Sequence, residues 1–187
     1  MKPQATLMFL CGKMAAGKST LARELAERRD AILFVQDELL EQLFPGEITD
    51  VAEFFDRSSR LRNAITPHIC AVLSKGISVV LDFPGNTRAQ RAWFRDIFER
   101  ARVEHELHFI DASDATCKRQ LKDRSRHLPP GTPWTSDAEF EAITVYFQAA
   151  IRRGRVQRRP SRARLKSRRD YRAEHVEPVQ HDDDPGR

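Results

Sequence analysis

One short segment near the amino terminus constrains this chain more than any other feature of its sequence. Residues Gly12–Thr20 read GKMAAGKST and match the pattern G-x-x-x-x-G-K-[S/T]. Glycines let the backbone curl so that successive N–H groups point at phosphate oxygens, and a following helix adds the positive end of its dipole. The apolar run ATLMFLC before it predicts a buried parallel strand. Strand, loop and helix together predict a nucleotide-binding site.

The residue types within this loop predict individual roles. The Lys18 ammonium should reach the β- and γ-phosphates of a bound nucleotide, and the Ser19 hydroxyl can ligate Mg²⁺. We therefore expect ATP and Mg²⁺ as cofactors. The expected nucleotide-binding residues are Gly12, Lys13, Met14, Ala15, Ala16, Gly17, Lys18, Ser19 and Thr20.

Strand-like and helix-like segments alternate along the body of the chain. Strands are expected at 5–11, 31–35, 77–82 and 104–110, and helices at 18–29, 37–44, 50–75, 87–102, 113–126 and 136–148. Pro67 is expected to kink or divide the long third helix, with Thr66 as a new N-cap. Capping boxes are expected at Asp50–Glu53 and Ser136–Glu139. The alternation predicts an α/β fold of the three-layer P-loop, nucleotide-kinase-like kind, with a parallel sheet between helices.

Two aspartates stand where predicted strands end. The carboxyl ends of parallel strands line one crevice, so Asp37 could face the γ-phosphate and accept a proton from a substrate hydroxyl. The alternative is that Asp37 is only a helix N-cap. Asp82 ends the run ISVVLD in a Walker-B-like pattern suited to holding Mg²⁺, and its alternative role is to cap a loop.

A basic cluster precedes a segment rich in proline and glycine at 127–135. A mobile lid around 125–136 could close over the transferring phosphate, neutralise its charge and exclude water. The competing interpretation is a solvated helix face. The cluster comprises Arg119, Lys122, Arg124 and Arg126.

Charge divides the chain into two parts. Residues 151–187 carry 12 Lys and Arg against 6 Asp and Glu, whereas the preceding 150 residues carry 20 against 21 and so have a net charge of −1. The charge of the first 150 residues therefore does not favour binding to nucleic acid. Only the basic tail has a charge that favours such binding. We expect a kinase-like domain over 1–149 and a disordered tail over 150–187, whose change in composition is of the kind that a shifted reading frame produces.

The motifs together resemble the small bacterial P-loop kinases of the AAA-like ATP-binding group, which are similar to zeta toxins and the kinase domain of polynucleotide kinase. The resemblance covers roughly 5–148 and implies that Asp37 is the general base and that Arg124 contacts the phosphates of ATP. In such kinases another arginine stands earlier in the helix before the lid. Here that position is occupied by Gln120, and the neighbouring Arg119 is the candidate substitute. These folds return to a fifth strand that the tail does not supply, so the sheet should lack its last strand. The supporting segments are GKMAAGKST, Asp37 after the second strand, VVLDFPGNT and CKRQLKDRSR.

The expected function is transfer of the γ-phosphate of ATP to a hydroxyl of a small-molecule or nucleotide-like acceptor. The alternative is a nucleotide-dependent switch or binding module with slow hydrolysis. The GTPase motif Asn-Lys-x-Asp is absent, and the chain is short for an oligomeric AAA+ motor. No apolar run approaches the roughly 18–20 residues that span a bilayer, and the widely spaced cysteines 11, 70 and 117 suit a reducing cytoplasm.

Overall fold

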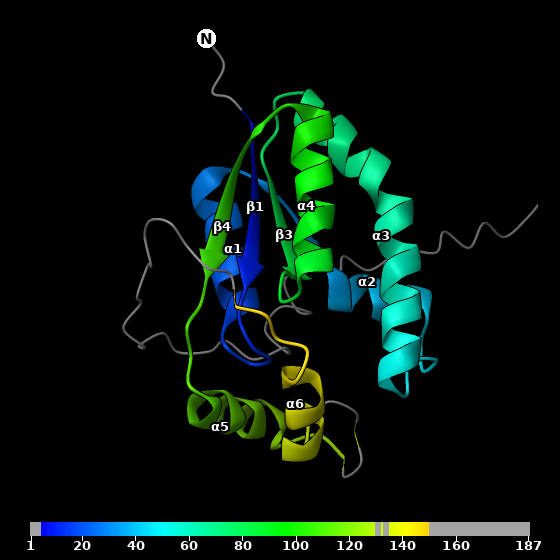
Figure 1. The fold of residues 1–187 in the computed structure, drawn as a ribbon, viewed down its shortest axis with the longest axis vertical. Coiled ribbons are helices and arrows are strands. Elements are labelled where there is room, and N and C mark those ends of the chain that lie inside the picture. Colours follow the sequence, from blue (N-terminus) through cyan, green and yellow to red (C-terminus); the bar gives the residue numbers. More distant parts are fainter. Residues whose placement is uncertain (1–4, 130–131, 133–134, 150–187) are drawn as a thin grey trace, which may run out of the picture.

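The computed structural model describes residues 5–129, 132 and 135–149. Four parallel strands form one sheet in the order β2-β3-β1-β4. Their arrowheads in Figure 1 point towards α5 and α6, so the carboxyl edge of the sheet faces these two helices. The strands are β1 (Thr6–Cys11), β2 (Ile32–Val35), β3 (Val79–Pro84) and β4 (Glu104–Phe109), and the helices are α1 (Lys18–Arg29), α2 (Gln36–Leu43), α3 (Val51–Ser74), α4 (Arg88–Ala101), α5 (Asp114–Ser125) and α6 (Asp137–Thr144).

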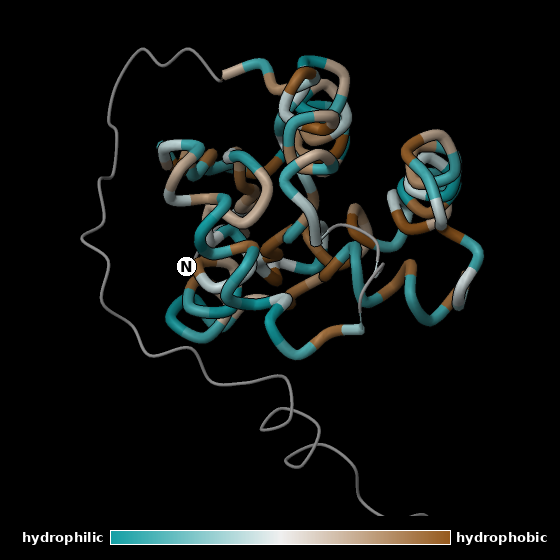
Figure 2. Tube along the Cα trace, turned by 90° about the horizontal axis from the view of Figure 1, so that it is seen from below, coloured by the Kyte–Doolittle hydropathy of each residue, from teal (hydrophilic) through white to brown (hydrophobic). Residues whose placement is uncertain are grey.

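Alternation along the strands separates two apolar layers. Leu7 and Phe9 of β1 face the cluster that contains α3 and α4 residues, whereas Met8 and Leu10 face the cluster around α1. Seen from below in Figure 2, the apolar segments gather between the helices. The expected α/β three-layer class is therefore confirmed, with β1 buried in the middle of the sheet.

The element boundaries differ from the sequence-based expectation by a few residues. The third strand was expected at 77–82 but forms at Val79–Pro84, because it pairs in register with Leu7–Phe9 of β1 and Ile32–Val35 of β2. The last helix was expected to reach 148 but ends at Thr144. Beyond it the backbone of Gln148 bonds to Asn86 and Arg91 instead of continuing the helix.

The long helix α3 contradicts the expected division at Pro67. It is continuous over Val51–Ser74, with Pro67 inside and exposed. The Thr66 hydroxyl does not cap a new helix: it donates to the Arg62 carbonyl at 2.6 Å and accepts a hydrogen bond from Trp93 Nε1 at 2.9 Å. This link to α4 and the buried Ile69 hold the helix together across the proline.

Side-chain caps begin several helices where the sequence predicts them. The expected capping box forms at Ser136–Glu139, and a further box that was not predicted forms at Thr87–Gln90. At α3 only half of the expected box forms, because Asp50 accepts from the Glu53 N–H while the Glu53 carboxylate accepts from Thr49.

Within the described residues, β4 has a strand partner on one side only, so the expected absence of a fifth strand agrees with the sheet as it stands. The expected tail at 150–187 and most of the proline- and glycine-rich tip of the lid lie outside the described residues.

Pro67 supplies a test of how α3 is stabilised. Proline in a helix interior removes one backbone hydrogen bond and costs up to about 3 kcal/mol. Since Pro67 is exposed, Pro67→Ala should raise the free energy of unfolding by at least about 1 kcal/mol and Tm by about 2–4 °C. Thermal unfolding would be compared with that of His68→Ala, an exposed neighbour on the same helix. A lower Tm for Pro67→Ala would show that the proline is a stabilising part of α3.

Candidate active site

The phosphate loop connects β1 to α1 in a curled conformation. Ala15 and Gly17 both have positive φ angles, of 57° and 94°, and the Ala16 N–H donates to the Lys13 carbonyl at 3.2 Å. Gly17 is the N-cap of α1 and offers no side-chain cap, and no acidic residue stands in the first turn. The first N–H groups of α1 are therefore directed at an anion bound in the loop.

The first residue of this loop is held by a hydrogen bond to the loop that follows β3. The Gly12 N–H donates to Asn86 Oδ1 at 3.0 Å, and a Cβ on Gly12 would lie 3.0 Å from the Ile110 carbonyl oxygen. The Asn86 N–H is held in turn by Gln90 Oε1 at 2.9 Å. Asn86 lies in the segment VVLDFPGNT but was not predicted to have a role, although a polar residue just past the third strand was the available signal.

Lys18 points back into the loop. Its ammonium Nζ donates to the carbonyls of Gly12 and Lys13, each at 2.8 Å. Burial lowers the pKa of Lys18, while the carboxylates of Asp82 and Asp37 act in the opposite direction. The lysine therefore lies within electrostatic reach of both aspartates predicted from the sequence to belong to the site.

Asp82 is 9% exposed and is hydrogen-bonded by the exposed Ser19 side chain. Burial and the neighbouring Asp37 carboxylate raise the pKa of Asp82, against the opposing effects of Ser19 and Lys18. A hydroxyl and a carboxylate in contact are hard oxygen donors of the kind that Mg²⁺ accepts, the remaining ligands coming from phosphates and water. Ser19 and Asp82 thus fit the ion. In the described part of the chain, no group of three or more His, Cys, Asp or Glu residues has the arrangement of a metal site.

Asp37 lies on the second residue of α2 and is exposed to solvent. Val35, its neighbour two residues earlier, pairs with Asp82 in the register of β2 with β3. The alternative that Asp37 caps α2 is wrong, because Val35 occupies the N-cap position and makes no side-chain cap hydrogen bond. Asp37 is therefore available at the carboxyl edge of the sheet.

Helix α5 packs beneath the phosphate loop. Its buried Cys117 and Leu121 share a cluster with Ala16 and the partly buried Met14. Both arginines are exposed, but Arg124 lies one turn beyond Leu121 on the same face of α5, whereas Arg119 lies on another face. This orientation keeps Arg124 as the candidate for phosphate contact and does not favour Arg119.

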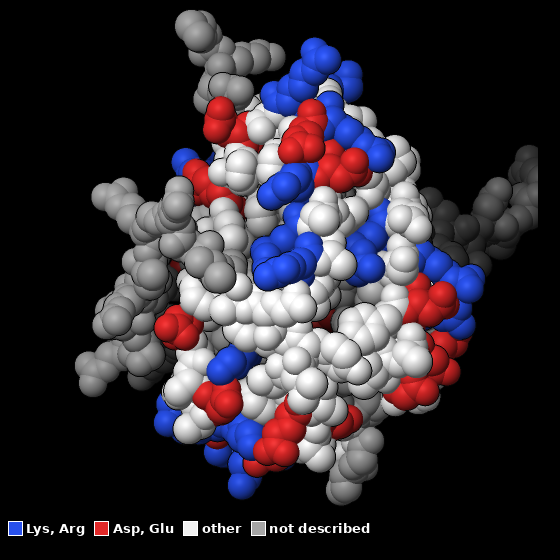
Figure 3. All heavy atoms as spheres, in the orientation of Figure 1, with Lys and Arg blue, Asp and Glu red and all other residues white. Residues whose placement is uncertain are grey.

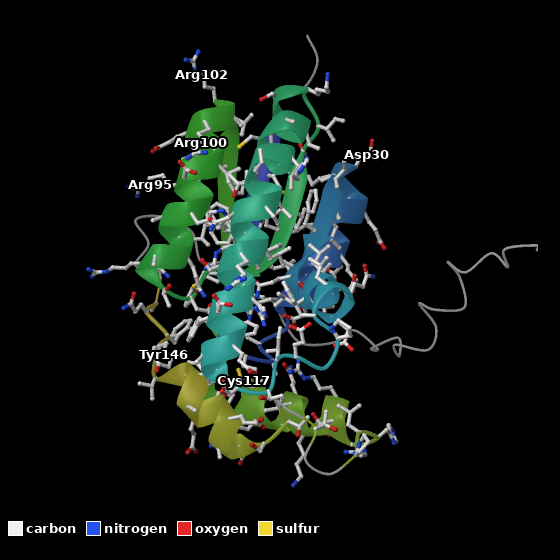
Figure 4. The ribbon with its side chains drawn as sticks, turned by 90° about the vertical axis from the view of Figure 1, so that its right-hand side faces the viewer. Asp30, Arg95, Arg100, Arg102, Cys117 and Tyr146 are labelled. Atoms are coloured by element: carbon white, nitrogen blue, oxygen red, sulfur yellow. The ribbon has the colours of Figure 1, made fainter. Side chains whose placement is uncertain are left out.

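The ends of the lid region are tied to the body. Lys13 of the phosphate loop forms an ion pair with Asp114 at the start of α5 and lies 5.9 Å from the centroid of the Phe147 ring. Residues 145–149, which we call the strap, follow α6 and bond to the loop after β3 through Gln148. Tyr146 of the strap contacts Phe55 of α3 with the ring centroids 5.8 Å apart, beside the α3 end seen in Figure 4.

The outer surface bears mixed charge. Figure 3 shows acidic side chains among the basic ones over α4, whose sequence contains both signs. Neither of two hollows, of about 320 Å³ between α5 and α6 and about 140 Å³ beside β2, is lined by a residue of the phosphate loop. We therefore locate the site by the loop and its aspartates. None of the helices in the described part of the chain is long and apolar enough to cross a membrane.

Comparison with known proteins agrees with this geometry. A family model described as an AAA domain matches residues 7–136. A shikimate kinase of Actinobacillus succinogenes is 36% identical over 80 residues, which cover 40% of this chain and 46% of that kinase. The chain thus spans about half the length of that relative.

Solved structures share the fold at low sequence identity. A candidate kinase of Chloroflexus aurantiacus J-10-fl superposes with a TM-score of 0.60 at 18% identity, covering 75% of each chain. A gluconokinase of Sinorhizobium meliloti 1021 superposes with a TM-score of 0.51 at 14% identity, covering 80% of this chain and 78% of that one.

Lys18 provides the first test of the site. Lys18→Ala removes the charge that should face the β- and γ-phosphates, so the affinity for ATP with Mg²⁺ should fall by at least about tenfold, or about 1.4 kcal/mol. Isothermal titration calorimetry measures this loss, with Lys75→Ala, an exposed lysine after α3, as the matched control. Equal affinities in the two variants would exclude Lys18 from nucleotide binding.

Asp82 provides a test whose sign depends on pH. Because its pKa is raised on folding, the protonated acid stabilises the nucleotide-free protein, and that stabilisation is lost as pH rises through the folded-state pKa. At neutral pH the ionised carboxylate therefore lowers the free energy of unfolding. Asp82→Asn should remove this effect and raise Tm by about 2–4 °C. The gain should disappear below about pH 4, where Asp82 is itself protonated. A gain of the same size at every pH would contradict this account.

Proposed function

The chain belongs to the AAA domain family and is a kinase-like P-loop NTPase, and from this premise we propose that it transfers the γ-phosphate of ATP to a hydroxyl of a small-molecule acceptor. One observation carries the proposal: the carboxylates of Asp37 and Asp82 both act on the charge of Lys18, so the groups that we propose as proton acceptor, metal ligand and phosphate ligand lie close together. A nucleotide-binding loop alone would not need the exposed carboxylate of Asp37.

The residues divide the chemistry among them. The N–H groups of the loop and the start of α1 bind the phosphates, and Lys18 exchanges its two carbonyl acceptors for phosphate oxygens. Ser19 and Asp82 would hold Mg²⁺, which would neutralise charge on the phosphates of the nucleotide. Arg124 approaches the same phosphates when the lid closes.

In the transfer step the acceptor hydroxyl oxygen bonds to the γ-phosphorus while the bond from that phosphorus to the β–γ bridging oxygen breaks. The hydroxyl proton passes to Asp37, and ADP leaves with the bridging oxygen. Asp37 suits this role because it is exposed at the sheet edge, where an acceptor can approach it.

Two comparisons support a small hydroxylated acceptor. The shikimate kinase matches part of this chain in sequence, and the gluconokinase shares its fold. Cys11, Cys70 and Cys117 form no disulfide, which supports the proposal of a reducing, cytoplasmic environment.

Asp37 is the residue on which the transferase proposal depends. General-base assistance contributes typically 10²–10⁴-fold, so Asp37→Asn should lower kcat by at least about 10²-fold while the ATP affinity changes by only a few-fold. Activity would be followed by transfer of ³²P from labelled ATP to a pool of metabolites, nucleosides and 5′-hydroxyl oligonucleotides.

The matched control for this variant is Glu41→Gln, an exposed carboxylate on the same helix. Transfer to no acceptor, together with slow release of inorganic phosphate, would instead identify a nucleotide-dependent switch. A kcat for Asp37→Asn equal to that of Glu41→Gln would remove Asp37 from the chemistry.

A further inference from the structure

The two edges of the sheet differ in their chemistry. Within the described part of the chain, β2 and β4 each have a strand partner on one side only. Four of the six residues of β4, EHELHF, are glutamate or histidine, and charged side chains on an edge strand oppose pairing with another strand. β2 reads ILFV, has no charged residue, proline or glycine, and pairs with β3 without a bulge. This edge therefore lacks the usual protection against strand pairing.

The backbone of β2 is oriented for such pairing. The Ile32 N–H donates to the carbonyl of Ser78, just before β3, at 3.0 Å. Because successive residues of a strand direct their N–H and C=O groups to opposite sides, those of Leu33 and Val35 point away from β3. Figure 4 views the molecule from this side, since β4, β1 and β3 follow one another from left to right in Figure 1. Asp30, labelled there, marks the turn from α1 into β2.

Apolar side chains surround this edge. Ile32 at the start of β2 and Leu43 at the end of α2 are 41% and 56% exposed. The hollow of about 140 Å³ lies between the two elements and is lined by Leu33, Phe34, Val35, Glu38, Leu39 and Gln42. Outward-pointing backbone groups beside apolar side chains are the combination through which one sheet recruits another strand.

The sequence around β2 is complementary to itself when two copies run antiparallel. Arg28 is exposed near the end of α1, before the strand, and Asp37 and Glu38 are exposed at the start of α2, after it. Antiparallel pairing centred on Leu33 places the basic start of each strand beside the acidic end of the other. A parallel pair would instead bring like charges together, so the charge pattern favours a second, antiparallel copy as the partner.

The backbone supports the same register. With Leu33 on the two-fold axis, the Leu33 N–H of each copy donates to the Leu33 carbonyl of the other, and the Val35 N–H donates to the Ala31 carbonyl. A register centred on Phe34 would instead need the Val35 carbonyl, which as the N-cap of α2 already accepts a bond from the first turn. In the Leu33-centred register, Ile32 of each copy lies opposite Phe34 of the other, beside the hollow.

We infer that β2 joins two copies of this chain as an antiparallel, two-fold symmetric pair, so that both sheets form one continuous sheet. Residues 151–187 are the competing occupant of the edge, but their 12 Lys and Arg against 6 Asp and Glu match an apolar edge poorly. Because the strand is short, the dissociation constant should be about 1–100 μM. This association does not depend on the reaction that the chain catalyses.

Analytical ultracentrifugation of the full chain over a series of concentrations tests the inference. We expect an equilibrium between monomer and dimer. Ile32→Lys places a charge at the edge of each copy, so the dissociation constant should rise by at least about tenfold. The matched control is Leu128→Lys, 43% exposed after α5, which should leave the dissociation constant within about twofold.

Oxidative cross-linking tests the register. The two Leu33 residues of the pair would have their Cα atoms about 5.5 Å apart, within the reach of a disulfide. Leu33→Cys should therefore form a covalent dimer at least about tenfold faster than Leu43→Cys, although Leu43 is the more exposed residue. Antiparallel pairing puts the two copies of Leu43 at opposite ends of the interface. The unsubstituted chain gives the baseline from its own cysteines.

Several results would overturn the inference. They are a full chain that stays monomeric at about 200 μM, a dissociation constant unchanged in Ile32→Lys, and oxidation of Leu43→Cys that is as fast as that of Leu33→Cys. Hydrogen exchange identifies the competing occupant. Slow exchange of the Leu33 and Val35 amides in a monomer would show that another segment of the same chain covers the edge, and this result would also refute the pairing of two copies.

Discussion

The close approach of the loop after β3 to the end of β1 is the contact on which the site depends. The Gly85 N–H donates to the Leu10 carbonyl at 3.1 Å, and a Cβ at Gly85 would lie 2.5 Å from that oxygen. One residue further, Asn86 holds the N–H of Gly12 and, through its own carbonyl, the N–H of Gln148. Three hydrogen bonds at two consecutive residues, Gly85 and Asn86, therefore join the end of β1, the phosphate loop and the strap to the loop after β3, and displacement of one would displace the others.

The polar groups at this edge of the sheet are held in an unfavourable state by the fold. Burial lowers the pKa of Lys18 and raises that of Asp82, and the buried side chains of Gln36 and Ser58 have no hydrogen-bond partner in the part of the chain that the structure describes. Burial of apolar side chains in the clusters on both faces of the sheet stabilises the fold and offsets the free-energy penalty of these polar groups. Groups whose charge or hydrogen bonding improves when ligands bind are a common feature of active sites.

The sequence predicted the order of elements and the phosphate loop because both leave local patterns. The apolar run ending at Gly12 and the capping residues Ser113 and Ser136 show the strand and helix starts directly. The continuity of α3 across Pro67 could not be predicted, since it depends on the contact of Thr66 with Trp93, 27 residues away. Asn86 and the strap were missed for the same reason: their partners are distant in sequence, and no periodic pattern records them.

The central position of β1 also determines how this chain must assemble. Leu7 pairs with Val79 on one side and His105 on the other, so neither neighbour exists when β1 leaves the ribosome. At synthesis rates of about 5–20 residues per second, the second neighbour follows roughly 5–20 s later. During that interval a strand whose residues from Leu7 to Cys11 end up almost completely buried is exposed to the solvent. The yield of folded protein in a cell will therefore depend on translation speed and on chaperones that shield this strand, independently of how stable the finished sheet is.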